Sequence, residues 1–417
     1  MHANQVTRNL KHNYLYNILD GAFFGLAIGF VNFSTILPLF VSTMTTSAVL
    51  IGLIPAIHNM GWQLPQLFLA RRISRLEHYK PLTLWMTINE RLPFAGLALV
   101  AWFLPGLSRP LALVLTYVFL VWQGLGAGLA ANPWQNLISR IIPGDMRGTF
   151  FGMQSAASNL LGSGGALAAG FLLARYSDTK GFAVCFAIAV FFLIVSWFAL
   201  AQTRETPRPL DALDYQLPEL WKNISAIMAK DKNFRWFLAS RILTQFAGMA
   251  TAFYTVYAVR FMGMNEVSAG ILTSVLLITQ TAANPLLGFA ADRWSRKAVL
   301  TVGSICTALS ALIAFLAPSL GWFYPIFILM GIGNVAYWTI GLALSLEFGE
   351  EHERPVYVGM ANTFIAPATI LAPLLGGLLA DTAGYRTTFW VAAAIGILTA
   401  VILLRFMRDP QAKQTRA

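Results

Sequence analysis

Apolar residues run in long stretches along the chain, and short polar or charged segments separate one stretch from the next. A helix needs about 20 predominantly apolar residues to cross the hydrocarbon core of a bilayer. Twelve stretches meet this requirement, some of them interrupted by single polar residues. They lie at about 14–41, 48–70, 81–104, 110–138, 149–173, 181–202, 234–261, 266–291, 298–317, 322–346, 355–380 and 385–406. The pattern therefore predicts an all-α membrane protein with twelve transmembrane helices.

The second group of six stretches repeats the first. Shifts of 207 and 221 residues superimpose arginines and small residues of the two groups, among them Arg147 on Arg354 and Arg72 on Arg293. Parallel repeats of this kind are related by an axis along the membrane normal. We therefore predict two pseudo-symmetric six-helix bundles, joined by a cytoplasmic linker that ends in a helix on the membrane surface. The predicted boundaries are 1–202 for the first bundle, 203–233 for the linker and 234–417 for the second bundle.

The composition agrees with a chain whose main solvent is lipid. Of the 417 residues, 57% are hydrophobic and only 11% are charged, and the mean hydropathy is +0.63, unlike that of ordinary soluble domains. Most Lys and Arg residues lie in segments on the side of the two termini, and the opposite side has Arg109, Arg175, Lys180, Arg260 and Arg386. Cytoplasmic loops carry the excess of Lys and Arg, so we expect both termini in the cytoplasm and the chain in a plasma membrane, the inner membrane in a bacterium. The net charge of +11 then reflects topology and attraction to anionic lipid, and we expect no nucleic acid partner.

The segment GFAADRWSRK, residues 288–297, concentrates charge between two apolar stretches. With two six-helix halves and a long central loop, it resembles the signature of the major facilitator superfamily, which is Gly, three residues, Asp-Arg, two residues and Arg-Lys. The matching residues are Gly288, Asp292, Arg293, Arg296 and Lys297. This resemblance implies the fold of that superfamily, secondary transport by alternating access, and a central cavity lined by spans one, four, seven and ten.

The resemblance also implies a conformational latch on the cytoplasmic side. In the superfamily the motif Asp faces the start of a helix in the opposite half, where unpaired N–H groups and the helix dipole favour an anion. The first half departs from this pattern because Arg71 occupies the Asp position, so we expect acidic residues before span eleven to complete a charge-swapped latch. The alternative is that these are solvated loop charges, since exposed ion pairs contribute about 0 to 1 kcal/mol. The candidate latch residues are Gly288, Asp292, Arg293, Arg296, Lys297, Arg71, Arg72, Arg75, Arg147, Glu350, Glu351, Glu353 and Arg354.

Four ionisable side chains inside predicted spans are candidates for function, because charges in the bilayer are costly. They are Asp20, Glu90, Arg91 and Arg241. The shift of 221 residues places Asp20 and Arg241 at equivalent positions, and both are candidates for proton coupling, since a carboxyl group beside a low-dielectric cavity can take up and release a proton as access alternates. The alternative for Asp20 is a structural pair with Arg91 or Arg241. For Glu90 and Arg91, which point about 100° apart on a helix, we expect a structural role.

Uncharged polar and aromatic residues in the spans are candidates for the substrate cavity, because amide and indole groups would be poorly satisfied in hydrocarbon. Hydrogen bonding between helices is the alternative for many of them. The candidates are Asn17, Asn32, His58, Gln63, Gln123, Asn132, Trp134, Asn136, Gln245, Gln280, Asn334, Tyr337 and Trp338.

The sequence argues against pumps and enzymes. It lacks the Gly-x4-Gly-Lys-Ser/Thr loop of nucleotide-driven pumps, and its five histidines are scattered, so we expect no enzymatic activity, no metal site and no cofactor. Two functions remain open. One is proton-coupled efflux of lipophilic compounds by an antiporter, which Asp20 and the aromatic content favour. The other is a porter for sugars or other polar metabolites, which the many Asn, Gln and Trp residues favour. We prefer efflux, and we expect a monomer whose partners are a small-molecule substrate, protons and membrane lipid.

Overall fold

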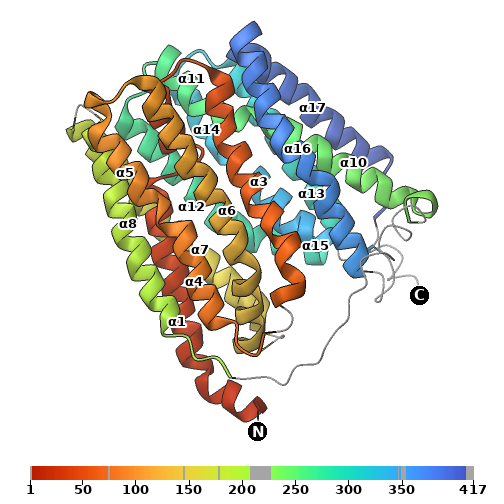
Figure 1. The fold of residues 1–417 in the computed structure, drawn as a ribbon. Coiled ribbons are helices and arrows are strands. Elements are labelled where there is room, and N and C mark those ends of the chain that lie inside the picture. Colours follow the sequence, from red (N-terminus) through yellow and green to blue (C-terminus); the bar gives the residue numbers. More distant parts are fainter. Residues whose placement is uncertain are drawn as a thin grey trace. The chain divides into compact units, whose positions relative to one another are not determined.

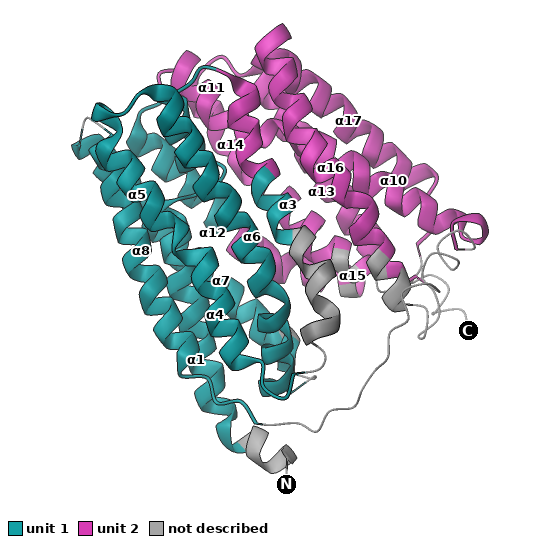
Figure 2. Ribbon diagram, in the orientation of Figure 1, with its two compact units in different colours: residues 1–46, 57–214, 264–278 teal, residues 47–56, 215–263, 279–417 magenta. Residues whose placement is uncertain are grey.

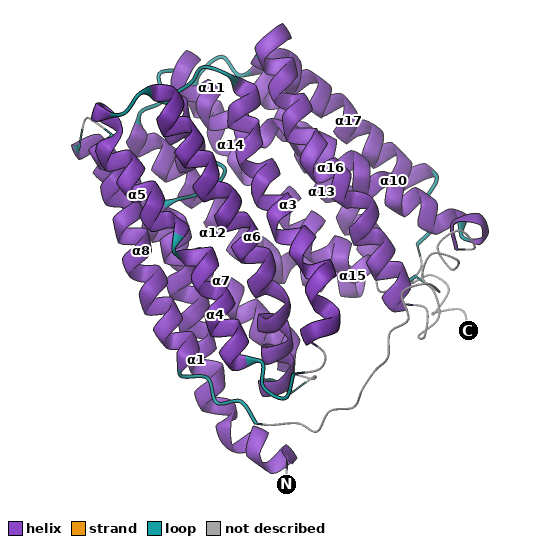
Figure 3. Cartoon of the chain, viewed as in Figure 1, coloured by secondary structure: helices purple, strands orange, loops and turns teal. Residues whose placement is uncertain are grey.

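The computed structural model describes residues 2–73, 76–143, 146–176, 179–206, 227–345, 347–348 and 354–409. These ranges consist of helices and short connections, and no strand occurs in them (Figure 3). Nine segments within them are long and apolar enough to cross a membrane. The remaining predicted spans, the first three along the chain, also consist of helices in the described residues, with a short non-helical break at residues 31–35 in the first. The predicted all-α membrane class is confirmed.

Within each half the helices follow one another along the chain, and the described connections between them are short (Figure 1). Those of the first half are α1 (His2–Phe30), α2 (Ile36–Ser42), α3 (Ala48–Ile73), α4 (Lys80–Arg91), α5 (Pro93–Phe103), α6 (Arg109–Ile141), α7 (Arg147–Arg175) and α8 (Lys180–Ala201). Those of the second half are α10 (Lys232–Ala247), α11 (Tyr254–Phe261), α12 (Glu266–Arg293), α13 (Arg296–Leu316), α14 (Phe323–Val335), α15 (Gly341–Ser345), α16 (Arg354–Ala383) and α17 (Tyr385–Arg405).

Several predicted spans are interrupted where a single straight helix was expected. The first span divides into α1 and α2, and the third divides into α4 and α5 at Pro93. Span seven runs as α10, a 3-10 segment at Gly248–Phe253 and then α11. Span ten runs as α14, a π-helical turn at Ala336–Ile340 and then α15. Hydrophobic length alone does not show these breaks, because apolar residues continue on both sides of each break.

The chain forms two compact units (Figure 2). Unit 1 comprises residues 1–46, 57–214 and 264–278, and unit 2 comprises residues 47–56, 215–263 and 279–417. Compared with the predicted halves, each unit therefore includes a short segment of the other half: the start of α3 belongs to unit 2, and the start of α12 belongs to unit 1. The predicted boundaries at 202 and 234 remain a prediction.

Unit 1 is held together by close contact of α1 with α7 and α8. Gly25 and Gly29 make this possible, because a Cβ at either position would overlap the backbone of α7 at Ser158 or Gly162. Small residues at such contacts let helix backbones approach closely where lipid supplies no hydrophobic driving force.

Unit 2 is built around α13 with α17, and α10 with α16 and α17. Its buried cluster combines aliphatic residues with the aromatic residues Phe234, Phe237, Phe348 and Tyr357. Asp231 caps the start of α10 by accepting a hydrogen bond from the backbone N–H of Phe234 at 2.9 Å, which satisfies one of the free donors of the first turn.

Candidate functional site

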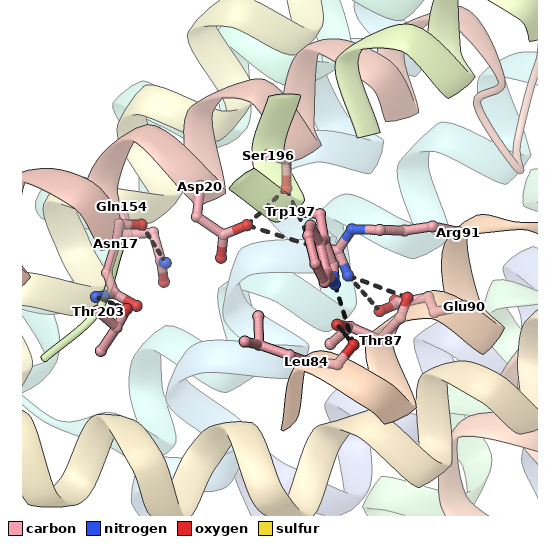
Figure 4. Close-up of polar contacts among 10 residues, drawn as sticks. All are labelled: Asn17, Asp20, Leu84, Thr87, Glu90, Arg91, Gln154, Ser196, Trp197 and Thr203. Atoms are coloured by element: carbon pink, nitrogen blue, oxygen red, sulfur yellow. Dashed lines mark hydrogen bonds and ion pairs between the residues drawn. The ribbon is translucent and has the colours of Figure 1, made fainter. Parts of the chain in front are cut away.

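Two acidic side chains and one basic side chain meet among the helices of unit 1 (Figure 4). Asp20 comes from α1, Glu90 and Arg91 come from the end of α4, and Ser196 comes from α8. Asp20 is 5% exposed, Arg91 is 8% exposed and Ser196 is fully buried. We call these four residues the acid–base cluster. The structure thus brings together three of the four intramembrane charges that the sequence showed as separate positions.

Arg91 is the centre of the acid–base cluster. Its Nη2 lies 3.3 Å from Oδ1 of Asp20 and donates to Oγ of Ser196 at 3.0 Å. The Ser196 hydroxyl donates to the same Oδ1 of Asp20 at 2.6 Å. Nη1 of Arg91 lies 3.8 Å from Oε2 of Glu90. Asp20 is therefore held by two hydrogen bonds, whereas Glu90 makes only a longer ion pair.

The break between α4 and α5 helps to place Arg91. Pro93 begins α5, and because proline has no N–H it leaves the carbonyl of Asn89 without its helical donor. On α6, Gly126 packs against the backbone of Asn89, and a Cβ at Gly126 would overlap it. On the α1 side, the guanidinium of Arg91 lies 5.4 Å from the centroid of the Phe24 ring. The Arg91 side chain is thus fixed beside a kink against which α6 packs closely.

The charges of the acid–base cluster do not cancel when both carboxyl groups are ionised. Among the described residues, Arg91 is the only cation within ion-pair distance of Asp20 or Glu90. An uncompensated buried charge is costly, and uptake of one proton would make the cluster neutral. Two carboxyl groups that share one cation titrate as a coupled pair. The arrangement can therefore hold one exchangeable proton.

A second polar contact lies one turn before Asp20. The side-chain amide of Asn17 donates to the backbone oxygen of Asn13 at 2.8 Å and to the hydroxyl of Thr203 at 3.1 Å, while Gln154 of α7 donates to the backbone oxygen of Asn17 at 2.9 Å (Figure 4). Asn17 is completely buried. Its side chain, predicted for the cavity, thus joins α1 to the segment that follows α8 and serves packing within unit 1.

His58 and Gln123, predicted independently from spans two and four, contact each other. Nδ1 of His58 lies 3.1 Å from Oε1 of Gln123, and the ring of Phe33 stacks on the imidazole at 4.1 Å between centroids. Gly61 and Gly124 face each other nearby, where a Cβ on Gly61 would overlap the backbone of α6. This close approach of α3 and α6 brings the two polar side chains within hydrogen-bonding distance.

Arg241 lies in unit 2, away from any carboxylate of the described residues. Its Nη1 donates to the backbone oxygen of Tyr337 at 2.6 Å, and its guanidinium carbon lies 4.3 Å from the centroid of the Tyr337 ring. Tyr337 belongs to the π-helical turn of span ten. Of the two arginines considered as partners of Asp20, the structure pairs Arg91 with it and not Arg241. Whether Asp20 also exchanges a proton stays a prediction.

The remaining cavity candidates are spread over both units. Asn32 accepts from the backbone of Ser34 at 2.9 Å, Asn136 donates to the backbone of Asn132 at 2.9 Å, and the ring of Trp134 packs edge-on against Phe151. In unit 2, the backbone of Gln280 accepts from Asn284 at 2.8 Å, Asn334 is partly buried, and Trp338 is 47% exposed. The side chain of Gln63 lies outside the described residues.

Only part of the predicted latch can be seen. Nη1 of Arg296 lies 2.5 Å from Oε1 of Glu347, the guanidinium of Arg293 lies over the ring of Phe289 at 4.6 Å, and Lys297 donates to the backbone of Leu404 at 3.4 Å. Arg147 donates to the backbone oxygens of Ile142, at 3.0 Å, and Ser139. Gly288 lies within α12 with open space beside it. The side chains that would complete the latch lie outside the described residues: Arg71, Arg72, Arg75, Asp292, Glu350, Glu351, Glu353 and Arg354. The charge-swapped latch stays a prediction.

Glu205 is a structural carboxylate that the sequence did not indicate. It accepts hydrogen bonds from the backbone N–H groups of Tyr79 and Lys80, both at 2.8 Å, and its Oε1 lies 3.2 Å from Nη1 of Arg140. Glu205 belongs to the predicted linker, yet it caps the start of α4. Its Pro-rich and charged surroundings suggested a loop, and no local signal pointed to a distant helix end.

Comparison with known proteins places this geometry in context. Residues 257–417 match the model of the Major Facilitator Superfamily. The "Probable vesicular acetylcholine transporter-B" of Danio rerio is 32% identical over 152 residues, which is 36% of this chain and 31% of that protein. The "Efflux pump aflT" of Aspergillus parasiticus is 28% identical over 156 residues, which is 37% of this chain and 30% of that protein. These alignments thus span about a third of each relative.

Similarity in fold to a solved structure extends over nearly the whole chain. The crystal structure of a D-xylose-proton symporter superimposes with a TM-score of 0.74, covering 95% of this chain and 98% of that one, at 18% sequence identity. At this identity the likeness concerns the fold alone.

Proposed function

We propose that this chain is a member of the major facilitator superfamily and a secondary transporter that exports lipophilic compounds in exchange for protons. The observation that carries the proposal is the acid–base cluster, in which Asp20 and Glu90 share the single cation Arg91. A proton driving force needs a group that is protonated in one state of the transport cycle and deprotonated in another. A buried set of two acids and one base provides such a group, because one proton decides whether its net charge is zero or negative.

Coupling requires that the site respond to movement of the helices around it. Asp20 lies on α1, which contacts α7 and α8, and Arg91 lies at the kink between α4 and α5. A small rotation of α1 would lengthen the contacts of Asp20 with Arg91 and Ser196, and loss of those contacts favours uptake of a proton. Conversely, a proton on the cluster would weaken the bonds that hold α1 to α4. The proton and the helix arrangement thus influence each other.

The direction of transport is inferred from the relatives. One relative is named an efflux pump and another a vesicular acetylcholine transporter, and the aromatic content of the chain suits an apolar substrate. A second candidate, a porter for sugars or other polar metabolites, is favoured by the contact of His58 with Gln123 beside the ring of Phe33. Amide and imidazole groups next to an aromatic ring suit a hydroxylated ring.

A thermal-stability screen tests this choice. The purified protein in detergent would be unfolded with a panel of lipophilic drugs and organic ions, and separately with a panel of sugars and polar metabolites. A ligand at about 100 times its dissociation constant stabilises the binding state by about 2.7 kcal/mol. Stabilisation by lipophilic compounds supports export, and stabilisation only by sugars supports the porter.

Compounds that bind would then be studied in proteoliposomes with an imposed pH gradient. Wild-type protein should accumulate the compound, against its gradient, in the compartment that is made acidic, because protons leave that compartment in exchange. Collapse of the pH gradient should stop accumulation. Accumulation that ignores the pH gradient would contradict proton coupling.

A further inference from the structure

Helix α10 carries two polar side chains one turn apart, Arg241 buried and Gln245 partly buried, and each has a buried donor atom without an acceptor among the described residues. These donors are Nε of Arg241 and Nε2 of Gln245. Arg241 is only 4% exposed. Residues four apart lie on the same face of a helix, so the two donors line one side of α10. Buried donors in folded proteins nearly always have acceptors, and two such donors on one helix face suit a ligand that supplies acceptor atoms.

The charge of Arg241 sets it apart from Arg91, which is buried, and Arg140, which is partly buried. Arg91 and Arg140 each lie within 3.3 Å of a carboxylate oxygen. Arg241 has no carboxylate within ion-pair distance among the described residues, and its contacts are the carbonyl and the ring of Tyr337. These contacts fix the guanidinium but leave its charge uncompensated. A buried cation of this kind calls for an anion.

The backbone around Arg241 leaves room for the guanidinium. Gly341 follows the π-helical turn, and a Cβ at this position would collide with Nη1 of Arg241. The helix that carries Arg241 itself gives way to a 3-10 segment at Gly248. Single π-turns occur often at functional sites, and interrupted membrane helices often form the substrate sites of transporters. Two interrupted spans of unit 2 therefore meet at this arginine.

We propose that Arg241 and Gln245 bind a carboxylate group of the transported substrate, an inference that rests on the proposed transport function and narrows its substrate class. A carboxylate has two oxygens in one plane, which can accept from the Nε–H of a guanidinium and from a side-chain amide together. One positive charge and one neutral amide match a single carboxylate better than a doubly charged phosphate. The substrate is then a lipophilic organic acid rather than a lipophilic cation.

The test uses ligands that share one apolar body and differ only in the end group: 4-phenylbutyrate, 4-phenylbutyramide and 4-phenylbutanol. Binding to the purified full-length protein would be measured by titration calorimetry at constant pH and salt. Wild-type protein should bind the acid at least about tenfold more tightly than the amide or the alcohol, a conservative figure for a charge-assisted pair. In Arg241→Gln this preference should vanish, and in Gln245→Leu it should fall by about three- to tenfold, the range for one neutral hydrogen bond.

Arg386→Gln is the matched control. Arg386 also donates to a backbone oxygen and lies over the ring of the same residue, Phe315, at 5.1 Å, but on an exposed surface. This variant should bind all three ligands like the wild type. If Arg241→Gln does not yield folded protein, Gln245→Leu and Gly341→Ala carry the test, since a Cβ at Gly341 must displace the guanidinium. Gly341→Ala should then weaken binding of the acid more than binding of the amide.

A second pair of ligands separates this inference from the proposed export of lipophilic compounds. Glucuronate and glucose differ by a carboxylate on a polar body. Preference for glucuronate, lost in Arg241→Gln, would support the carboxylate site while rejecting a lipophilic substrate. Equal binding of acid and amide in the phenylbutyl series would overturn the carboxylate site while leaving lipophilic export standing. Absence of binding in both series would overturn the inference.

Discussion

The carboxylate of Asp381, at the end of α16, caps the first turn of α3 through the backbone N–H of Ala48, which lies 2.6 Å from Oδ1. The N–H of Val49 and the hydroxyl of Ser47 both donate to Oδ2, at 3.0 and 2.8 Å. All four residues belong to unit 2. An anion at this position satisfies free backbone donors and complements the positive end of the helix dipole. The start of α3 is thus fastened to the other half of the sequence.

The repeat produces a similar contact in unit 1, but without an acid. Gly377 leaves room for the start of α3, and Gly170, its equivalent after the shift of 207 residues, leaves room for the start of α12 at Glu266 and Gly270. The charge pattern of the loops predicts that both contacts lie on the side away from the termini. In the described residues a carboxylate, Asp381, caps the helix start at the contact of α16 with α3. The equivalent contact of α7 with α12 has no such carboxylate in those residues.

Loss of the cap should destabilise the protein. We expect Asp381→Ala to lower the free energy of unfolding by about 1 kcal/mol, as loss of a capping side chain usually does. Asp381→Asn keeps an acceptor oxygen and should cost clearly less. Thermal unfolding in detergent measures both, and equal stability of Asp381→Ala and wild type would show that the cap contributes nothing.

The acid–base cluster predicts rescue by a second substitution. Arg91→Gln leaves two buried acids without a cation and should cost about 3 to 5 kcal/mol, the usual cost of breaking a buried pair. Asp20→Asn in the same chain removes one of these acids and should recover much of the loss. If the double variant is as unstable as the sum of the two single variants, the residues do not act as a charge pair.

Proton coupling should depend on the excess of acids in the acid–base cluster, which holds two carboxyl groups and one guanidinium. Asp20→Asn and Glu90→Gln each leave one carboxyl group for Arg91, so the remaining pair is neutral without a proton. Both variants should fold and bind substrate, yet transport driven by a pH gradient should fall at least about tenfold, which lies within the range of about 5- to 150-fold typical of a coupling free energy. Full pH-driven transport in both variants would refute the cluster as the proton site. Glu266→Gln is the control, because it removes a carboxyl group that is exposed and lies outside the acid–base cluster.

Close helix contact at the kink of span three gives a further prediction. Gly126→Ala places a methyl group against the backbone of Asn89, so α6 must move away from α4, and overpacking of this kind costs about 1 to 3 kcal/mol. Gly164→Ala is matched in chemistry, but it points into open space and should stabilise its helix by up to about 1 kcal/mol. Unfolding midpoints of the two variants should therefore shift in opposite directions.

The charge-swapped latch remains open to test. Glu351→Arg should favour the state open to the cytoplasm, because it would place a cation opposite Arg71, and Arg71→Glu in the same chain should restore the balance. Labelling of single cysteines on the two faces measures this equilibrium. Unchanged labelling in both variants would remove the latch from consideration.

The sequence predicted the parts of this protein that depend on local pattern. Apolar length indicated the membrane helices, repeated arginines and glycines indicated two halves, and the residues of the 288–297 motif indicated the superfamily. These signals are local. The thickness of a bilayer fixes the length of a span, and the charges of a loop can be read from the few residues of that loop. The same reasoning marked Asp20, Glu90, Arg91 and Arg241 as functional candidates, since any charge inside a span is exceptional.

The tertiary structure decided which of these residues meet. Asp20 could have paired with Arg91 or Arg241, and only the rotation of α1 against α4 and α8 selects Arg91 and adds Ser196. Asp381 directly follows the predicted span at 355–380, and only its position over the start of α3 makes it a cap. Helix rotation and contact depend on the packing of residues that are far apart in sequence. Hydrophobic pattern therefore determines that a helix crosses the membrane, but not which neighbour its polar residues face.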